Sequence, residues 1–194
     1  MTDEDILAEF RAAGALLTGH FRLSSGLHSD TYLQCARVMM DAARGERLCK
    51  ALADKLRGEG AGPFDMIASP AMGGVIVGYE VGRQLGIPAM FYERVEGRFT
   101  LRRGFAMAPG TRCLMVEDVV TTGLSSRECI QAITGDGGVA VAAAALVDRS
   151  GGKADIGVPF TPLVTLEIKN YTGDDLPPHL AATEAVKPGS RALR

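Results

Sequence analysis

Along this chain, segments with the hydrophobic spacing of a helix alternate with segments that have the hydrophobic pattern of a strand. Near the N-terminus, apolar residues recur at helical spacing, at Ile6, Phe10, Ala13 and Leu17. Thr2 and Asp5 have the pattern of a capping box, in which each side chain accepts a hydrogen bond from the other residue's backbone amide. We therefore expect a first helix here.

The rest of the chain continues this alternation. Further helices are expected over residues 43–57, 75–85 and 127–133, and strands over residues 65–69, 87–92, 114–116, 139–147 and 163–168. Residues 24–31 are polar and turn-rich, and the charged residues 93–104 predict a hairpin or a mobile loop. Strands that alternate with helices predict an α/β fold, with a mostly parallel sheet covered on both faces.

Three loops lie where the ligands of parallel sheets bind, beyond the carboxyl ends of strands. They are residues 69–74, 121–126 and 148–152, and each follows an expected strand. We expect these loops to converge on one site.

Composition narrows the class of protein. The 194 residues suit one domain, and 46% hydrophobic with 23% charged residues is typical of a globular protein. A net charge of −2 gives no general attraction to nucleic acid or anionic membranes. The acidic start argues against a secretory or mitochondrial leader. The cysteines lack C-x-x-C spacing and are expected to be reduced core thiols in a cytoplasmic protein: Cys35, Cys49, Cys113 and Cys129.

Two adjacent carboxylates, Glu117 and Asp118, end one expected strand and precede the hydroxyl- and glycine-rich turn 121–126. Loop amides and the positive end of a helix bind phosphate, and carboxylates accept hydrogen bonds from sugar hydroxyls. The combination predicts a site for a phosphorylated sugar. Two plainer alternatives remain open: the carboxylates cap a helix or face solvent, and Ser125 or Ser126 is an ordinary N-cap.

A second glycine-rich turn, residues 70–74, is either a simple turn or a site for another anionic group such as a pyrophosphate. A strained or cis non-proline peptide is expected around Ala71–Met72, because the loop must turn its amides inward. A basic cluster follows at Arg94, Arg98, Arg102 and Arg103. It is either a solvated face or a flexible hairpin that closes over a pyrophosphate leaving group.

Two further residues are candidates for binding. Arg149 follows a buried strand, where it either makes a surface ion pair or binds a substrate carboxylate. The three histidines lack metal-ligand spacing, and His28, in the polar stretch 24–31, is the one worth testing.

These residues also carry a resemblance to a known family. The run Val116-Glu-Asp-Val-Val-Thr-Thr-Gly-Leu-Ser-Ser126 resembles the phosphoribosyl-pyrophosphate motif of type I phosphoribosyltransferases. Five more segments resemble the orotate-specific members of that family: residues 19–34, 93–94, 101–105, 146–149 and 187–191. The similarity therefore spans nearly the whole chain.

The resemblance implies a type I phosphoribosyltransferase fold, a mostly parallel twisted sheet flanked by helices with a small N-terminal hood. It implies a single domain over residues 1–194, with the hood at about 1–35 plus parts of the C-terminal tail and the core at about 40–168. The implied reaction is orotate plus phosphoribosyl pyrophosphate giving orotidine monophosphate and pyrophosphate, with Mg²⁺. A homodimer is also implied, in which the hairpin acts in the neighbouring site.

Site residues follow from the same resemblance. Those implied to bind phosphoribosyl pyrophosphate are Glu117, Asp118, Val119, Val120, Thr121, Thr122, Gly123, Leu124, Ser125, Ser126, Ala71, Met72, Gly73, Gly74 and Arg94. Those implied to bind orotate are Thr121, Arg149, Tyr32, Ser25 and His28. The implied catalytic residues are Asp118, Arg94, Arg102 and Arg103, and Asp118 would lie near a magnesium ion held mostly by the substrate.

The chain departs from the family pattern at the pyrophosphate end. Many members have lysine where Ser24 and Gly73 stand here, and their mobile loop is longer and contains lysine and histidine. Arginines of the short hairpin are the expected replacements. Two alternative functions stay open, a phosphoribosyltransferase for another base and a non-catalytic regulator that senses phosphoribosyl pyrophosphate.

Overall fold

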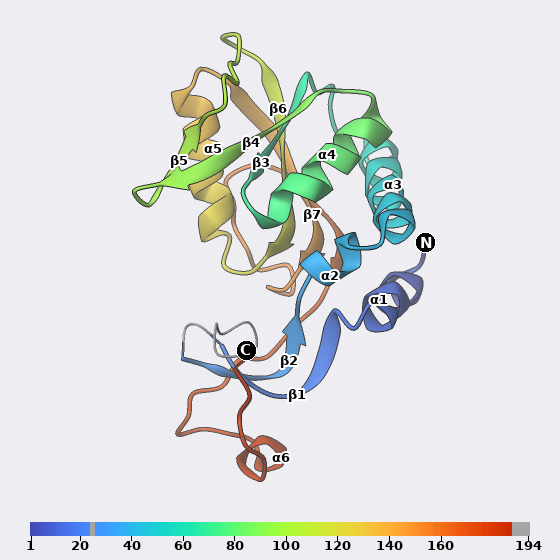
Figure 1. Cartoon of the computed structure of the whole chain (residues 1–194), viewed down its shortest axis with the longest axis vertical. Helices are drawn as coiled ribbons and strands as arrows, with labels where there is room; N and C mark the ends of the chain where they lie inside the picture. The colour runs from blue at the N-terminus through green and yellow to red at the C-terminus, as the bar shows by residue number, and fades with distance from the viewer. Residues whose placement is uncertain (24–25, 188–194) are drawn as a thin grey trace.

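A six-stranded sheet forms the centre of the computed structural model, which describes residues 1–23 and 26–187 (Figure 1). Its strand order is β5-β4-β3-β6-β7-β8. The strands are β3 (Met66–Pro70), β4 (Ala89–Val95), β5 (Arg98–Leu101), β6 (Arg112–Val120), β7 (Val139–Asp148) and β8 (Phe160–Thr165). All neighbours pair in parallel except β4 and β5, which form an antiparallel hairpin. The predicted parallel sheet is confirmed, and residues 93–104 contain the hairpin.

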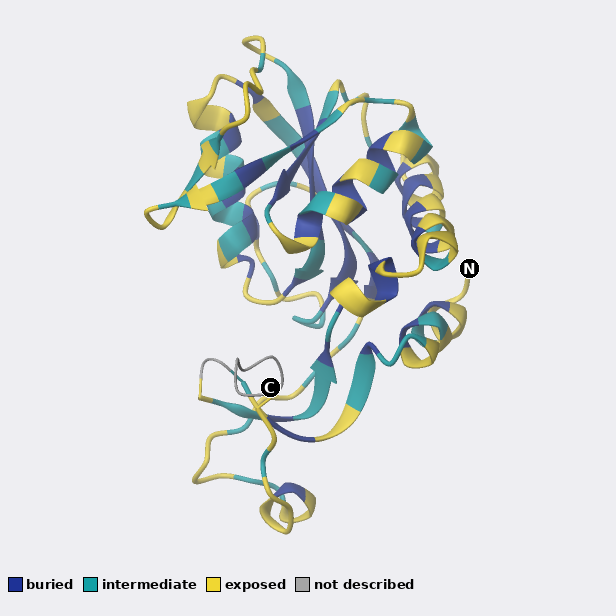
Figure 2. Cartoon of the chain, viewed as in Figure 1, coloured by how far each residue is buried: buried dark blue, intermediate teal, exposed yellow. Residues whose placement is uncertain are grey.

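Helices cover both faces of this sheet. The helices α3 (Ala42–Gly58) and α4 (Gly73–Leu85) lie on one face, and α5 (Leu124–Gly135) lies on the other (Figure 1). Successive residues of a strand point to opposite faces. Accordingly, Leu114 and Val116 of β6 pack with α3 and α4, whereas Cys113 and Met115 pack with α5. The central strands are therefore buried on both sides, as the dark segments of Figure 2 show.

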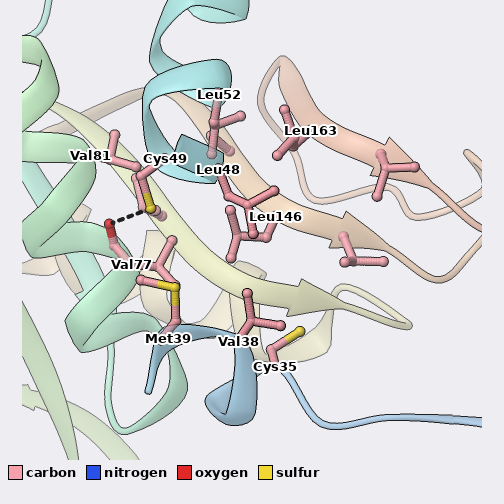
Figure 3. Packing of buried hydrophobic residues seen from close by; sticks show 14 of the residues in the cluster. Cys35, Val38, Met39, Leu48, Cys49, Leu52, Val77, Val81, Leu146 and Leu163 are labelled. Atoms are coloured by element: carbon pink, nitrogen blue, oxygen red, sulfur yellow. Dashed lines mark hydrogen bonds between the residues drawn. The ribbon is translucent and has the colours of Figure 1, made fainter. Parts of the chain in front are cut away.

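The core under α3 and α4 is built from interlocking aliphatic and sulfur side chains (Figure 3). Leu48 and Leu52 of α3 face Val77 and Val81 of α4, and all four are fully buried. Full burial of each of these side chains contributes about 1.5–3 kcal/mol to the stability of the fold. This packing fixes α4, whose first turn belongs to the loop at the carboxyl end of β3.

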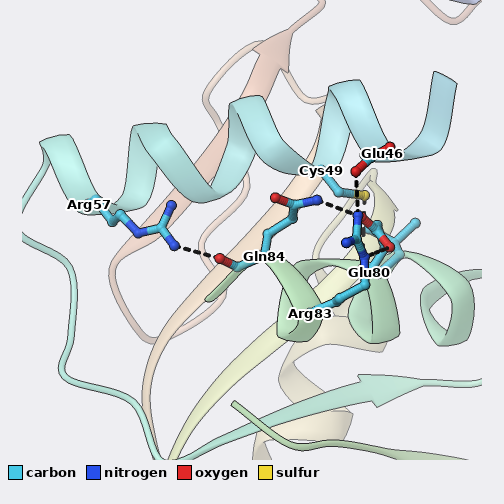
Figure 4. A network of polar contacts seen from close by, with 7 residues as sticks. Glu46, Cys49, Arg57, Glu80, Arg83 and Gln84 are labelled. Carbon is cyan, nitrogen blue, oxygen red and sulfur yellow. Dashed lines mark hydrogen bonds and ion pairs between the residues drawn. The ribbon is translucent and has the colours of Figure 1, made fainter. Parts of the chain in front are cut away.

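A polar network joins the same two helices at the surface (Figure 4). Arg83 of α4 donates to Glu46 of α3 at 2.6 Å and to Glu80 at 2.8 Å, and Gln84 donates to Glu80 at 2.7 Å. Arg57 of α3 donates to the carbonyl of Gln84 at 2.5 Å. Each exposed ion pair contributes little to stability. The network therefore serves mainly to hold α4 in a fixed alignment along α3.

A small second layer lies apart from the main sheet, formed by β1 (Leu16–Arg22) and β2 (His28–Leu33) in an antiparallel pair (Figure 1). The C-terminal tail pairs with both strands, through Phe21 with Val186 and His28 with Tyr171. Helix α6 (Pro178–Ala181) belongs to this tail, and α1 (Asp3–Ala12) and α2 (Ala36–Met39) join the layer to the core. It corresponds in position to the predicted N-terminal hood.

The structure corrects three element boundaries. The capping box of Thr2 and Asp5 is present, but α1 ends at Ala12 and Leu17 lies in β1. Gly14, with φ of 59°, turns the chain there, so the apolar spacing that reached Leu17 was not one helix. Residues 28–31 are strand rather than turn, because a half-exposed two-stranded layer accepts polar side chains. The last strand runs from Phe160 to Thr165 rather than over 163–168.

The four cysteines are free and buried, as predicted, and burial raises the pKa of Cys49 to about 12 and that of Cys113 to about 11. Such thiols are protonated at neutral pH and inert. Across residues 1–23 and 26–187, every helix is too short or too polar to cross a membrane.

Candidate active site

Three loops meet at one edge of the sheet, because their strands are parallel neighbours. In register, Ala68 of β3 lies beside Met115 of β6, and Val120 of β6 lies beside Asp148 of β7. The loops that follow these strands, 69–74, 121–126 and 148–152, therefore share the carboxyl edge. Their predicted convergence is confirmed.

The paired carboxylates Glu117 and Asp118 point in different directions from this edge. Glu117 is buried, with 7% of its surface exposed, and the Ser126 hydroxyl on α5 donates a hydrogen bond to it. Asp118 lies on the other side of β6, where a Cβ atom on Gly73 would come within 2.5 Å of Asp118 Oδ1. The two carboxylates therefore lie on opposite faces of β6, because adjacent strand residues face opposite ways.

Burial raises the pKa of both acids. It raises the pKa of Glu117 to about 7, against the opposing effect of the hydrogen bond from Ser126. Burial also raises the pKa of Asp118, although hydrogen bonds from backbone amides oppose that shift. A group that is half charged near neutral pH at the end of a strand is typical of a functional site.

We expect a pH dependence to follow from Glu117. Its charged form accepts hydrogen bonds from hydroxyl groups, and protonation below its raised pKa removes one acceptor. The value of kcat/KM for a ribose-bearing substrate should therefore fall as pH drops through about 7. Glu117→Gln should remove this acid limb, which initial rates from pH 5.5 to 9 would measure. An unchanged limb in the variant would assign it to another group or to the substrate.

The loop before α5 exposes backbone amides. Gly123 takes the left-handed conformation with φ of 74°, and its Cβ would meet Ile156 at 2.7 Å, so only glycine fits. In the described structure no side chain caps the N-terminus of α5, although the Leu124 amide donates weakly to Thr122 Oγ1 at 3.4 Å. Thr121, Thr122 and Leu124 are exposed. Free amides at a helix N-terminus favour phosphate.

The β3–α4 loop is the second glycine-rich turn. Its Ala71–Met72 peptide is cis, as the sequence led us to expect, and the Ala71 amide donates to the Tyr92 carbonyl at 2.8 Å. Gly74 is buried, and its Cβ would lie 2.8 Å from the Val116 carbonyl. Gly73 and Met72 are exposed. The backbone thus approaches β6 closely while the turn itself stays open.

Ion pairs and a ring contact within the chain hold the arginine hairpin in place. Arg94 pairs with Glu128 of α5 at 2.5 Å, and its guanidinium lies 4.1 Å from the centre of the Phe99 ring. Arg103 pairs with Glu93 at 2.8 Å. Arg102 is exposed and makes no ion pair with any described residue. The charge of Arg94 is one of the weaker influences that lower the pKa of Glu117, so this arginine lies within electrostatic reach of that carboxylate.

Arg149, at the end of β7, carries a half-buried guanidinium. Its Nε has no hydrogen-bond partner within the part of the chain that the structure describes. Burial lowers its pKa, and Cys35 and Tyr32 oppose that shift, which places Tyr32 near the guanidinium. The Tyr32 hydroxyl donates to Gln34 at 2.7 Å.

The two other residues predicted to bind orotate are His28 and Ser25. His28 Nδ1 lies 2.6 Å from His20 Nε2, and His20 Nδ1 lies 2.9 Å from the Thr183 carbonyl. This chain of contacts joins the hood to the C-terminal tail. Ser25 falls outside the described residues, as does most of segment 187–191.

A cavity of about 460 Å³ lies between the end of β2 with α2, the β3–α4 turn and the end of β6. Its lining residues are Leu33, Gln34, Cys35, Ala36, Met39, Met72, Gly73, Ile76, Asp118 and Val119. Of these, the sequence predicted Met72, Gly73, Asp118 and Val119 as site residues, and it missed the other six: Leu33, Gln34, Cys35, Ala36, Met39 and Ile76. Gln34 closes the segment 19–34 that carried the family resemblance, which could have pointed to it, whereas Cys35 and Ile76 read as ordinary core residues.

The acid-and-glycine loop and the second glycine loop lie together at one edge of a parallel sheet, which is the arrangement expected for a phosphoribosyltransferase. Comparison with known proteins agrees, because the family model of the phosphoribosyl transferase domain matches residues 40–175. The chain therefore belongs to the phosphoribosyltransferase family. Among its relatives are orotate phosphoribosyltransferases: one from Sphingopyxis alaskensis is 62% identical over 100% of this chain and 99% of its own length. Another, from Caulobacter vibrioides, is 58% identical over the full length of both.

Solved structures show the same fold. The orotate phosphoribosyltransferase from Aeropyrum pernix superposes with a TM-score of 0.67 at 25% identity, covering 86% of this chain and 94% of its own. The enzyme from Mycobacterium tuberculosis, solved in complex with inorganic phosphate, gives a TM-score of 0.67 at 20% identity and covers 84% and 95%. The architecture is thus retained where most of the sequence has changed.

Proposed function

We propose that this chain is an orotate phosphoribosyltransferase. It transfers the phosphoribosyl group of 5-phosphoribosyl 1-pyrophosphate to orotate, giving orotidine 5′-monophosphate and pyrophosphate in the de novo synthesis of UMP. The observation that carries the proposal is the full-length similarity to enzymes of that name at about 60% identity. The half-buried Arg149, whose Nε has no hydrogen-bond partner among the described residues, supports the choice of base, since orotate bears a carboxylate.

The site suggests a role for each group of residues. Glu117 and Asp118 hold the ribose hydroxyls, and the amides of residues 122–126 hold the 5′-phosphate. The β3–α4 loop, residues 71–74, faces the pyrophosphate. Thr121, Arg149 and Tyr32 contact orotate, with Ser25 and His28 in the hood near it. The free amides at the start of α5 support the phosphate assignment.

The chemistry requires no covalent intermediate with the protein. The bond from the anomeric carbon to the pyrophosphate oxygen breaks as the bond from that carbon to the orotate nitrogen forms, and positive charge develops on the ribose. Carboxylates beside the sugar stabilise that charge, and arginines neutralise the departing pyrophosphate. Among the hairpin residues, we assign Arg94 to the site of its own chain, since its charge lowers the pKa of Glu117 there. We assign Arg102 and Arg103 to the part of the hairpin that would reach a neighbouring site.

Magnesium fits these residues as an ion carried mainly by the substrate. The described residues contain no group of three or more His, Cys, Asp and Glu side chains that could hold a metal. Mg²⁺ keeps several waters and binds through one or two carboxylates plus substrate phosphates, which matches a site with Asp118 at its rim. When bound, the ion would neutralise negative charge on the pyrophosphate.

A direct assay tests the proposal. The protein is incubated with phosphoribosyl pyrophosphate and Mg²⁺, and orotate, uracil, adenine and hypoxanthine are offered in separate reactions. We expect only orotate to be consumed, with release of one pyrophosphate per nucleotide. Consumption of another base instead would assign the chain to a different phosphoribosyltransferase.

We also propose a homodimer in which the hairpin of one subunit reaches the site of the other. Exposed apolar side chains support a self-association face: Met40, Met72, Ile76 and Tyr79, which are 82%, 84%, 56% and 68% exposed. Light scattering on the purified protein would give the mass, and a monomer would contradict this proposal.

We propose a cytoplasmic location, supported by the four free thiols.

A further inference from the structure

Ser126 is a residue whose place differs from that of its neighbours in the phosphate loop. It is the third residue of α5 and only 1% exposed, whereas Thr121 and Thr122 lie open to solvent. Its hydroxyl donates a hydrogen bond to Oε2 of Glu117 on β6. Its side chain therefore turns inward to the carboxylate and away from the exposed side of the loop.

Glu117 depends on this contact. A buried carboxylate is costly unless hydrogen bonds or a cation compensate it. Arg94, which lies near it, is engaged by Glu128 at 2.5 Å. The other charged or titratable groups around Glu117 are Asp118 on the same strand and Cys129 on α5, neither of which supplies a cation. The Ser126 hydroxyl donates to Oε2 of Glu117, and the Ser125 hydroxyl also lies close enough to lower the Glu117 pKa, so the charged form is stabilised by hydroxyl donors at the start of α5.

We infer that Ser126 is a positioning residue for Glu117. Its hydroxyl fixes Oε2, so the carboxylate is held in one rotamer with Oε1 directed to a ribose hydroxyl. The inference rests on the proposed function, in which Glu117 binds the ribose. The contribution of Ser126 to the 5′-phosphate then comes from its backbone amide alone, and its side chain acts through Glu117.

A double-mutant cycle tests this assignment. Ser126→Ala, Glu117→Gln and the double variant are compared with the wild-type protein, and kcat and KM are measured for phosphoribosyl pyrophosphate and for orotate. We expect Ser126→Ala to lower kcat/KM for phosphoribosyl pyrophosphate about tenfold, with KM for orotate within about twofold of wild type. In the Glu117→Gln background the same change should have an effect below about twofold, because the neutral amide accepts the Ser126 hydrogen bond more weakly and no carboxylate is left to be positioned.

Controls separate positioning from general damage. Thr134→Ala removes another hydroxyl from α5, one that donates to the Ile130 carbonyl at 3.0 Å near the far end of the helix, and should leave the kinetics unchanged. Ser126→Cys keeps the volume while replacing a strong donor with a weak one, so it should lose activity as the alanine variant does. If Ser126→Ala does not fold, the cycle is run with Ser126→Cys.

The outcomes distinguish the inference from the function on which it rests. Equal losses in the two backgrounds would mean that the Ser126 side chain acts directly on the phosphate or on the fold, and would overturn the inference. No loss in either Ser126 variant would overturn it as well. Absence of orotate turnover in the wild-type protein would instead overturn the proposed function, whatever the variants do.

Discussion

Asp118→Asn is expected to lower kcat with orotate by about 100-fold or more while leaving the fold intact. The carboxylate lies at the edge where β6 ends, with its oxygens against the open β3–α4 turn at Gly73. In the proposed reaction it faces the ribose as positive charge develops there. Asparagine keeps the shape and one acceptor oxygen but removes the charge, so substrate binding should suffer less than the chemical step.

Steady-state rates and a thermal melt measure this prediction together. Burial raises the pKa of Asp118, so its charge is already disfavoured in the free protein and the substitution should not lower the melting temperature. Asp54→Asn is a matched control, because Asp54 is exposed on α3 and pairs with Lys50 at 2.6 Å. That variant should retain full activity. Near-normal rates in Asp118→Asn would remove Asp118 from its catalytic role.

The sheet and its loops could be predicted from sequence because local signals agreed with the final arrangement. Residues 139–147 form a long run of mostly small apolar side chains, and they form a central strand that is buried along most of its length. Gly86 ends α4 in the left-handed conformation, as its position after the last apolar residue indicated. Parallel strands then bring their carboxyl ends together, so the convergence of the loops needed no further information.

Side-chain direction at the site could not be predicted in the same way. Glu117 and Asp118 are adjacent in the sequence, yet one faces α5 and the other faces the start of α4. The hydrogen-bond partner of Glu117 is Ser126, nine residues later on α5. The sequence motif predicted Ser126 as a phosphate ligand instead. The His20–His28 contact was also hidden, because it depends on the pairing of β1 with β2 and on the tail that packs against them.

Arg149→Gln is expected to raise KM for orotate by about 10- to 100-fold, with KM for phosphoribosyl pyrophosphate nearly unchanged. The guanidinium is half-buried and its Nε lacks a partner among the described residues, so it has lost water without gaining an acceptor. A carboxylate of the base would restore that interaction as a charged hydrogen bond. Glutamine retains a donor but not the charge or the paired geometry of the guanidinium.

The selectivity of this effect is the stronger test. Uracil lacks the carboxylate, so any residual rate with uracil should change little between wild type and Arg149→Gln, while the rate with orotate falls. Arg11→Gln serves as the control, since Arg11 is exposed on α1 and pairs only with Glu4 at 2.7 Å among the described residues. An equal loss with both bases would mean that Arg149 supports the structure of the β7 loop. An unchanged KM for orotate would place the carboxylate elsewhere, and the unpaired Nε would then need another ligand.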